Sequence, residues 1–147
     1  MRGKRNYILT AIAAFFMLVV VSCQKEEDTG PSGPPGSGDM RAAYAGNWRC
    51  TETSSITPGT TVYYVQISLH PTINNQIQIA NIYNLGTTVS AYALVNGNNT
   101  FAIPQQVLVG NTIEGNGTLL NSTNISMDYT ATAGSTIDDV TCALLKQ

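Results

Sequence analysis

Positive charge is scarce in this sequence. Its 147 residues include 7 basic and 9 acidic side chains. From residue 41 onward the basic side chains are Arg41, Arg49 and Lys146. A nucleic-acid-binding surface needs a stripe of positive charge, so we expect no nucleic-acid partner.

Side chains that carry catalysis are also few. The single histidine, His70, precedes Pro71 at the end of an alternating segment, which is typical of a turn residue and not of a general base. No serine or cysteine stands in a nucleophile motif. Asp138 and Asp139 are adjacent, so in a strand they point to opposite faces, and we interpret them as part of a solvated turn. The sequence has no cluster of histidines and cysteines and no calcium-loop spacing, and we therefore expect a protein that is not an enzyme and holds no metal or cofactor.

Long apolar runs are limited to one, residues 7–21, which follows the basic leader MRGKRN. Fifteen helical residues span about 22 Å, which is short of the roughly 30 Å hydrocarbon core of a bilayer. A basic leader, a short apolar core and the small residue Ser22 predict a lipoprotein or secretory signal peptide over residues 1–22.

The next residues have the pattern of a lipid-attachment site. Val20-Val21-Ser22-Cys23 resembles the bacterial lipobox, which implies that Cys23 becomes the first residue of an outer-membrane lipoprotein and carries palmitate-type acyl chains in the bilayer. A secreted protein with a chance cysteine is the alternative. The following segment, QKEED, is similar to the export signal of Bacteroidetes surface lipoproteins and implies display on the cell exterior. The alternative is a solvated spacer on the periplasmic leaflet.

Residues 23–40 form a lipidated N-terminus and a flexible linker, because segment 29–39 consists mainly of Gly, Pro and Ser. The remainder, residues 41–147, is long enough for one domain and too short for two. Of the three cysteines, lipidation of Cys23 leaves Cys50 and Cys142 as a pair, for which we predict a disulfide between the first and last strands.

Apolar and polar residues alternate through this domain, so we expect it to be almost all β. Short strands with tight turns predict an antiparallel meander closed into a small barrel of about eight strands, with a β-sandwich as the alternative. Lys146 is the one lysine of the domain, and open sheet edges usually need more, which favours closure. The predicted strands cover residues 48–53, 61–70, 75–83, 88–95, 100–103, 106–109, 112–119, 124–130 and 140–145.

The first of these strands contains a second resemblance. Within YAGNWRC, Gly46-x-Trp48 resembles the lipocalin or calycin signature, which implies an up-and-down barrel whose closed end is crossed by Trp48. The domain departs from that family in its length and in having no helix after the last strand. The segments ANIYNLG, TFAIPQQ, TIEGNGTL and ISMDYT are similar to small Bacteroidetes lipoproteins, a resemblance that implies no mechanism.

Aromatic residues in the inward phase of the strands are the candidate ligand-binding residues. They suit a small apolar or glycan ligand at the barrel mouth, and a filled core is the alternative. Outward Tyr64, Tyr92 and Leu94 suggest instead a patch for an outer-membrane protein partner. We therefore expect a non-enzymatic small-ligand-binding or interaction module; the alternatives are an accessory subunit of an outer-membrane assembly, or an inhibitor of host lysozyme or protease acting through loop 53–61. The candidate ligand-binding residues inside the barrel are the aromatic residues and one inward amide, Asn81; the full set is Trp48, Tyr63, Asn81, Tyr83, Phe101 and Tyr129.

Overall fold

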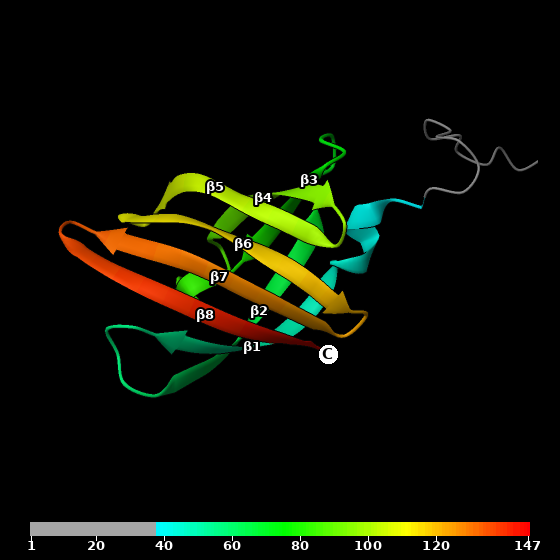
Figure 1. Cartoon of the computed structure of the whole chain (residues 1–147). Coiled ribbons are helices and arrows are strands. Elements are labelled where there is room, and N and C mark those ends of the chain that lie inside the picture. Colours follow the sequence, from blue (N-terminus) through cyan, green and yellow to red (C-terminus); the bar gives the residue numbers. More distant parts are fainter. Residues whose placement is uncertain (1–37) are drawn as a thin grey trace, which may run out of the picture. The chain divides into compact units, whose positions relative to one another are not determined.

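Eight antiparallel strands follow one another around a closed barrel in the computed structural model of the chain, which describes residues 38–147 (Figure 1). Each strand pairs with the next, and β8 returns to pair with β1 from Lys146 opposite Trp48 to Val140 opposite Ser54. The predicted all-β barrel of eight strands is confirmed, and the sandwich alternative is excluded. The strands are β1 (Gly46–Ser54), β2 (Thr60–Leu69), β3 (Gln76–Ala80), β4 (Ser90–Gly97), β5 (Thr100–Leu108), β6 (Asn111–Asn121), β7 (Asn124–Ala133) and β8 (Thr136–Lys146).

The predicted signal peptide, Cys23 and most of the predicted linker lie outside the described residues. Two short 3-10 helices accompany the barrel, η1 (Met40–Ala43) before β1 and η2 (Ile82–Asn84) between β3 and β4. Neither of these described helices has the length and apolar character needed to cross a bilayer.

The alternation along the strands determines what the barrel encloses. In β1, Trp48, Cys50 and Glu52 point inward and are buried, while Arg49 and Thr53 face solvent. The same period continues around the barrel, and the inward side chains form one apolar cluster. Burying each large apolar side chain of this cluster stabilises the fold by about 1.5 to 3 kcal/mol, so the barrel is held mainly by its interior.

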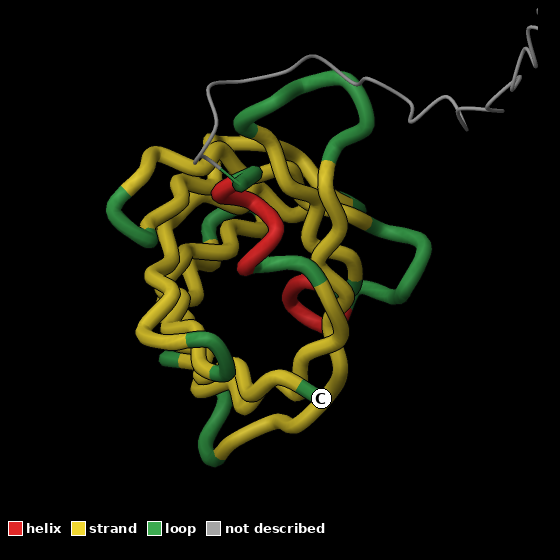
Figure 2. The backbone as a smooth tube through the Cα atoms, turned by 90° about the vertical axis from the view of Figure 1, so that its right-hand side faces the viewer, coloured by secondary structure: helices red, strands yellow, loops and turns green. Residues whose placement is uncertain are grey.

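η1 lies over part of one end of the barrel (Figure 2), and buried side chains fill this end, which we call the closed end. The Trp48 indole is fully buried at this end, and its Nε1–H donates to the Tyr44 carbonyl at 2.9 Å. The Tyr44 ring meets Phe101 edge to face at 5.5 Å between centroids. Lys146 lies over the indole ring, with Nζ 5.1 Å from the ring centroid. The indole therefore lies where the lipocalin resemblance implied.

Arg41 fastens η1 to the barrel. Its guanidinium forms an ion pair with Asp39 at 2.7 Å, and this contact holds the pKa of the Asp39 carboxyl below its usual value. Nη1 of the same side chain donates to the carbonyls of His70 and Ile73 in the β2–β3 connection and to that of Gln76 at the start of β3. The Nδ1 atom of His70 accepts hydrogen bonds from the backbone N–H groups of Thr72 and Ile73. His70 is therefore a turn residue, as the sequence indicated.

Two details of the predicted strands were wrong. Residues 100–103 and 106–109 belong to one strand, β5, whose pairing with β6 shifts register between Ile103 and Gln106. Pro104 lies in this bulge, where its missing N–H costs no ladder hydrogen bond. The predicted strand 75–83 ends at Ala80, because Asn81 and Tyr83 have positive φ values of 64° and 53° and turn the chain into η2.

Candidate functional site

A carboxylate lies inside the barrel, in the half away from η1. Glu52 is 7% exposed and projects inward from β1. Two tyrosine hydroxyls donate to its Oε2 atom, that of Tyr63 on β2 and, at 2.7 Å, that of Tyr129 on β7. The Cys142 thiol on β8 also donates to Oε2, at 3.7 Å. These three neighbours satisfy the hydrogen bonding of a group that is costly to bury.

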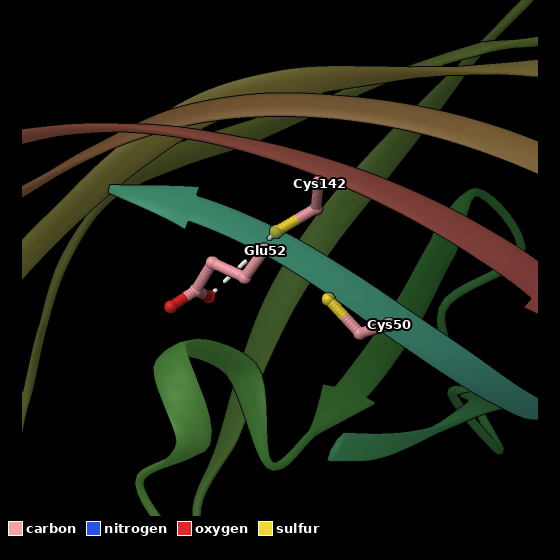
Figure 3. A group of neighbouring side chains, drawn as sticks. All are labelled: Cys50, Glu52 and Cys142. Carbon is pink, nitrogen blue, oxygen red and sulfur yellow. Dashed lines mark hydrogen bonds between the residues drawn. The ribbon is translucent and has the colours of Figure 1, made fainter. Parts of the chain in front are cut away.

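Two fully buried thiols accompany this carboxylate (Figure 3). In the β1–β8 ladder Cys142 stands opposite Glu52, while Cys50 stands opposite Leu144 and is therefore diagonal to Cys142. The two Sγ atoms and a carboxylate oxygen of Glu52 all lie within 4.8 Å of one another. Both cysteines are thiols in this structure, and the disulfide between them stays a prediction. We call Cys50, Glu52, Cys142, Tyr63 and Tyr129 the Glu52 cluster.

Burial and mutual contact shift the pKa values of the tyrosines and cysteines of the Glu52 cluster. Burial raises the pKa of Tyr63 and of Tyr129, and their acidic neighbours add to this effect, so both hydroxyls remain hydrogen-bond donors. The contact with Cys142 lowers the pKa of Cys50, whereas the same contact, together with burial, raises the pKa of Cys142. The two thiols contact each other, so the loss of a proton from one affects the other.

A second buried carboxylate, Asp138, holds the β1–β2 loop. It is 1% exposed and accepts hydrogen bonds from the Ser54 hydroxyl, the Ser55 backbone N–H and the Tyr83 hydroxyl. Burial raises its pKa, but these hydrogen bonds outweigh burial and leave the pKa of Asp138 below its usual value. The interpretation of Asp138 as part of a solvated turn was wrong, because the position points into the barrel; Asp139 beside it does face solvent.

Tyr83 connects this carboxylate with the Glu52 cluster. It is half-buried, and its ring meets that of Tyr129 edge to face at 6.2 Å between centroids. Burial, followed by the hydrogen bond to Asp138, raises the pKa of Tyr83 to about 12. The β1–β2 loop that Asp138 holds extends beyond the barrel wall and includes the exposed residue Ile56 (Figure 1).

A hollow of about 450 Å³ lies on the outer face of the barrel beside β2 and β3. It forms because β2 and β3 pair from Gln66 opposite Ala80 onward, and the chain then leaves the sheet at Asn81. The Asn81 side chain fixes this departure: Nδ2 donates to the Tyr64 carbonyl, and Oδ1 accepts the Gly86 N–H, both at 2.7 Å. We call this the outer hollow. Val65 and Ala80 contribute to its lining, and its polar lining consists of Asn47, Tyr64, Gln66, Asn81, Thr87 and Gln147.

A second hollow, of about 380 Å³, lies on the outer face of β6, β7 and β8. Its lining includes the carboxylates of Glu114, Asp128 and Asp139. The two outer hollows thus differ in charge, since no charged side chain of the described residues lines the first.

The six candidate residues from the sequence divide among different places. Trp48 and Phe101 belong to the closed end, whereas Tyr63 and Tyr129 belong to the Glu52 cluster, and Tyr83 lies between that cluster and Asp138. Asn81 lines the outer hollow. Of the outward candidates, Tyr64 and Tyr92 are exposed, at 59% and 37%, and Leu94 is half-buried.

Sequence reasoning named Asn81 and Tyr64 but missed Glu52 and the rest of the polar lining of the outer hollow, Asn47, Gln66, Thr87 and Gln147. The signal for Glu52 was its phase: it follows Trp48 and Cys50 at intervals of two, on the face predicted to be buried. The outer hollow had no such signal, because it depends on where β3 separates from β2.

No family model matches the chain, and no curated protein matches it either. Among solved structures, the chain is similar to EF1p2_mFAP2b bound to DFHBI, with a TM-score of 0.56 and 16% identity over 76% of this chain and 100% of that chain. It is also similar to a redesigned β-barrel, b11L5F_LGL, with a TM-score of 0.51 and 19% identity over 76% of this chain and 99% of that one. These likenesses show the fold, a small closed barrel of eight strands.

Proposed function

We propose that this chain is a non-enzymatic binding module, anchored by lipid at Cys23 to the outer membrane and displayed on the cell surface, that binds a small neutral polar ligand such as a glycan. The observation that carries the proposal is the outer hollow. Its volume of about 450 Å³ falls within the range of roughly 300 to 1,000 Å³ that is usual for small-ligand sites.

The chemistry of the outer hollow favours an uncharged ligand rich in hydroxyl groups. Asn47 and Gln66 supply amides, each of which offers both donors and an acceptor, and Thr87 adds a hydroxyl. The exposed Tyr64 ring offers an apolar face against which the C–H groups of a sugar ring can pack. A charged ligand would find no charged side chain of opposite sign among the described residues of this lining.

The barrel fold is compatible with this role, since EF1p2_mFAP2b, a barrel of the same fold, binds DFHBI. That likeness supports small-ligand binding by such a barrel in general. The choice of the outer hollow and of a glycan rests on the lining residues of this chain.

The binding proposal is tested with neutral oligosaccharides, either arrayed or titrated by calorimetry. Tyr64→Ala should weaken binding by about tenfold or more, because a stacked aromatic is commonly worth at least about 1.4 kcal/mol. Tyr92→Ala is the matched control, since Tyr92 is another exposed tyrosine of the outer face and lies away from the outer hollow. Equal oligosaccharide affinities of the two variants would mean that the outer hollow is not the binding site.

The anchoring proposal has its own tests. Cys23→Ser should release the protein from the membrane fraction, and a variant that stayed there would contradict lipid attachment. Deletion of residues 25–28 should protect the protein from protease added to intact cells, and unchanged cleavage would contradict the surface export signal.

A second candidate function, the accessory subunit of an outer-membrane assembly, is favoured by the edge of β2. Residues 60–65 pair with β1 alone, and Val62 and Tyr64 in this segment are 55% and 59% exposed. A partner strand that joined this edge would gain backbone hydrogen bonds and cover both side chains. Val62→Lys should release such a partner in cross-linking on cells and leave oligosaccharide binding unchanged.

A further inference from the structure

The Glu52 cluster has the spacing of a metal site. In a tetrahedral zinc centre, bonds of about 2.3 Å to sulfur and 2.0 Å to oxygen place sulfur and oxygen about 3.5 Å apart and two sulfurs about 3.8 Å apart. Cys142 Sγ lies 3.7 Å from Glu52 Oε2, and the atoms of Cys50, Glu52 and Cys142 are all within 4.8 Å of one another. Shifts of less than about 1 Å would bring the three atoms onto one ion.

The charge around Glu52 also favours a cation. The ion pair found in the described residues joins Arg41 and Asp39, so Glu52 is a buried carboxylate without a cationic partner there. Tyrosine hydroxyls satisfy its hydrogen bonding but supply no positive charge. A divalent cation held by this carboxylate and two thiolates would give Glu52 a cationic partner, and the net charge of the cluster would stay the same because two protons leave as the ion enters.

The tyrosines would then support the ligands without binding the ion. The Tyr129 hydroxyl lies 2.7 Å from Glu52 Oε2 and 3.9 Å from Cys142 Sγ, and the Tyr63 hydroxyl contacts the same carboxylate. Donors in such positions orient metal ligands and spread their negative charge.

We propose that Cys50, Glu52 and Cys142 bind one thiophilic divalent cation, Zn²⁺ or an ion of similar softness, inside the barrel. Two thiolates select such ions over Mg²⁺ and Ca²⁺, which prefer oxygen ligands throughout. Each thiol releases one proton on binding, so two protons leave as one ion enters. The cation connects β1 with β8, the two strands that close the barrel. This site is separate from the outer hollow, and the proposal does not depend on the proposed function.

A disulfide between Cys50 and Cys142 is the competing use of the same sulfurs. It would require an oxidant and would remove both thiolates from the ion. The diagonal placement of the two cysteines across the ladder is less favourable for a bridge than a directly opposite pair. A carboxylate beside the sulfurs has a role in a metal site and none in a bridge.

The test uses the full-length chain, purified with a reducing agent and titrated first with Co²⁺ and then with Zn²⁺. We expect one Co²⁺ per chain, with thiolate-to-cobalt charge-transfer absorption that is lost when Zn²⁺ displaces Co²⁺. Calorimetry of Zn²⁺ binding in buffers of different ionisation enthalpy should show release of about two protons per ion.

Three variants and two matched controls assign the ligands. Cys50→Ser and Cys142→Ser should each weaken Co²⁺ binding at least about 100-fold, and Glu52→Gln at least about tenfold. Cys23→Ser changes the proposed lipid-attachment residue, and Glu114→Gln removes an exposed carboxylate on β6; both variants should bind Co²⁺ as the parent does. Circular dichroism shows that each variant keeps its strands; a variant that unfolds is replaced by Tyr129→Phe, which should weaken Co²⁺ binding without removing a ligand.

Three results would overturn the proposal. One is the absence of thiolate-to-cobalt absorption in the folded, reduced chain. Another is Co²⁺ binding that survives in folded Cys50→Ser and Cys142→Ser variants. The third is a Cys50–Cys142 disulfide that persists in the folded protein under reducing conditions.

Discussion

The Glu52 cluster and the outer hollow are both polar, but they differ in room and in charge. The Glu52 cluster is buried, carries a carboxylate and two thiols, and the carboxylate accepts hydrogen bonds from groups inside the barrel. The outer hollow has a volume of about 450 Å³ and a lining of uncharged amides and hydroxyls. The first suits a bare ion and the second a neutral molecule, so one barrel offers two kinds of binding chemistry at separate places.

The largest effect on stability is expected from a substitution in the barrel interior. Trp48→Ala should lower the free energy of unfolding by about 3 to 5 kcal/mol, because it empties the closed end of the barrel and removes the hydrogen bond to the Tyr44 carbonyl. Urea denaturation followed by circular dichroism measures the loss. Leu145→Ala, at an exposed position of β8, is the control, and an equal loss there would contradict the assignment of Trp48 to the closed end.

A smaller effect is expected from the hydroxyl groups around the carboxylate. Tyr129→Phe should lower the free energy of unfolding by about 1 to 3 kcal/mol, because Glu52 then loses a donor that water cannot replace in the enclosed cluster. Tyr64→Phe removes an exposed hydroxyl and should change stability by less than about 0.5 kcal/mol. Similar losses in the two variants would mean that water reaches the Glu52 cluster.

Acid should weaken the barrel through Asp138. The folded state holds the pKa of this carboxyl below its usual value of 3.8, so the unfolded chain binds the proton more readily. Its contribution to stability is therefore complete above about pH 4 and is lost as the pH falls through the lower, folded pKa. Thermal unfolding between pH 2 and 6 measures this loss, and Asp138→Asn should flatten the acid limb. An unchanged acid limb in that variant would assign the effect to other carboxyls.

The smallest effect on folding is expected at the outer hollow. Gln66→Ala should alter the free energy of unfolding by less than about 0.5 kcal/mol, since Gln66 is exposed on β2. The same variant should weaken oligosaccharide binding severalfold, because it removes an amide from the lining. If the variant loses more free energy of unfolding than free energy of oligosaccharide binding, Gln66 has a structural role and not a binding role.

Strand alternation explains why the barrel could be predicted from the sequence. The period of two placed Trp48, Cys50 and Cys142 inside, and the structure buries all three. Glu52 has the same phase, but a carboxylate is normally exposed. Its partners Tyr63 and Tyr129 lie 11 and 77 residues away in the sequence, on other strands. Such a contact depends on the barrel register and not on local pattern.

Local backbone departures explain the remaining differences. The alternation of residues 75–83 continues through Asn81, yet the positive φ of Asn81 turns the chain out of the sheet and opens the outer hollow. The bulge at Pro104 joins two segments that the pattern separates. Asp138 was misread because its partners, Ser54 and Ser55, lie more than 80 residues away in the sequence.

The most direct test of the account is a titration of the isotope-labelled chain with a neutral oligosaccharide that it binds, followed by amide chemical shifts. The account predicts that shifts concentrate at Asn47, Tyr64, Gln66 and Thr87 around the outer hollow, and that Tyr63 and Tyr129 in the Glu52 cluster stay unchanged. Shifts concentrated at Tyr63 and Tyr129, or spread evenly over the barrel, would contradict it.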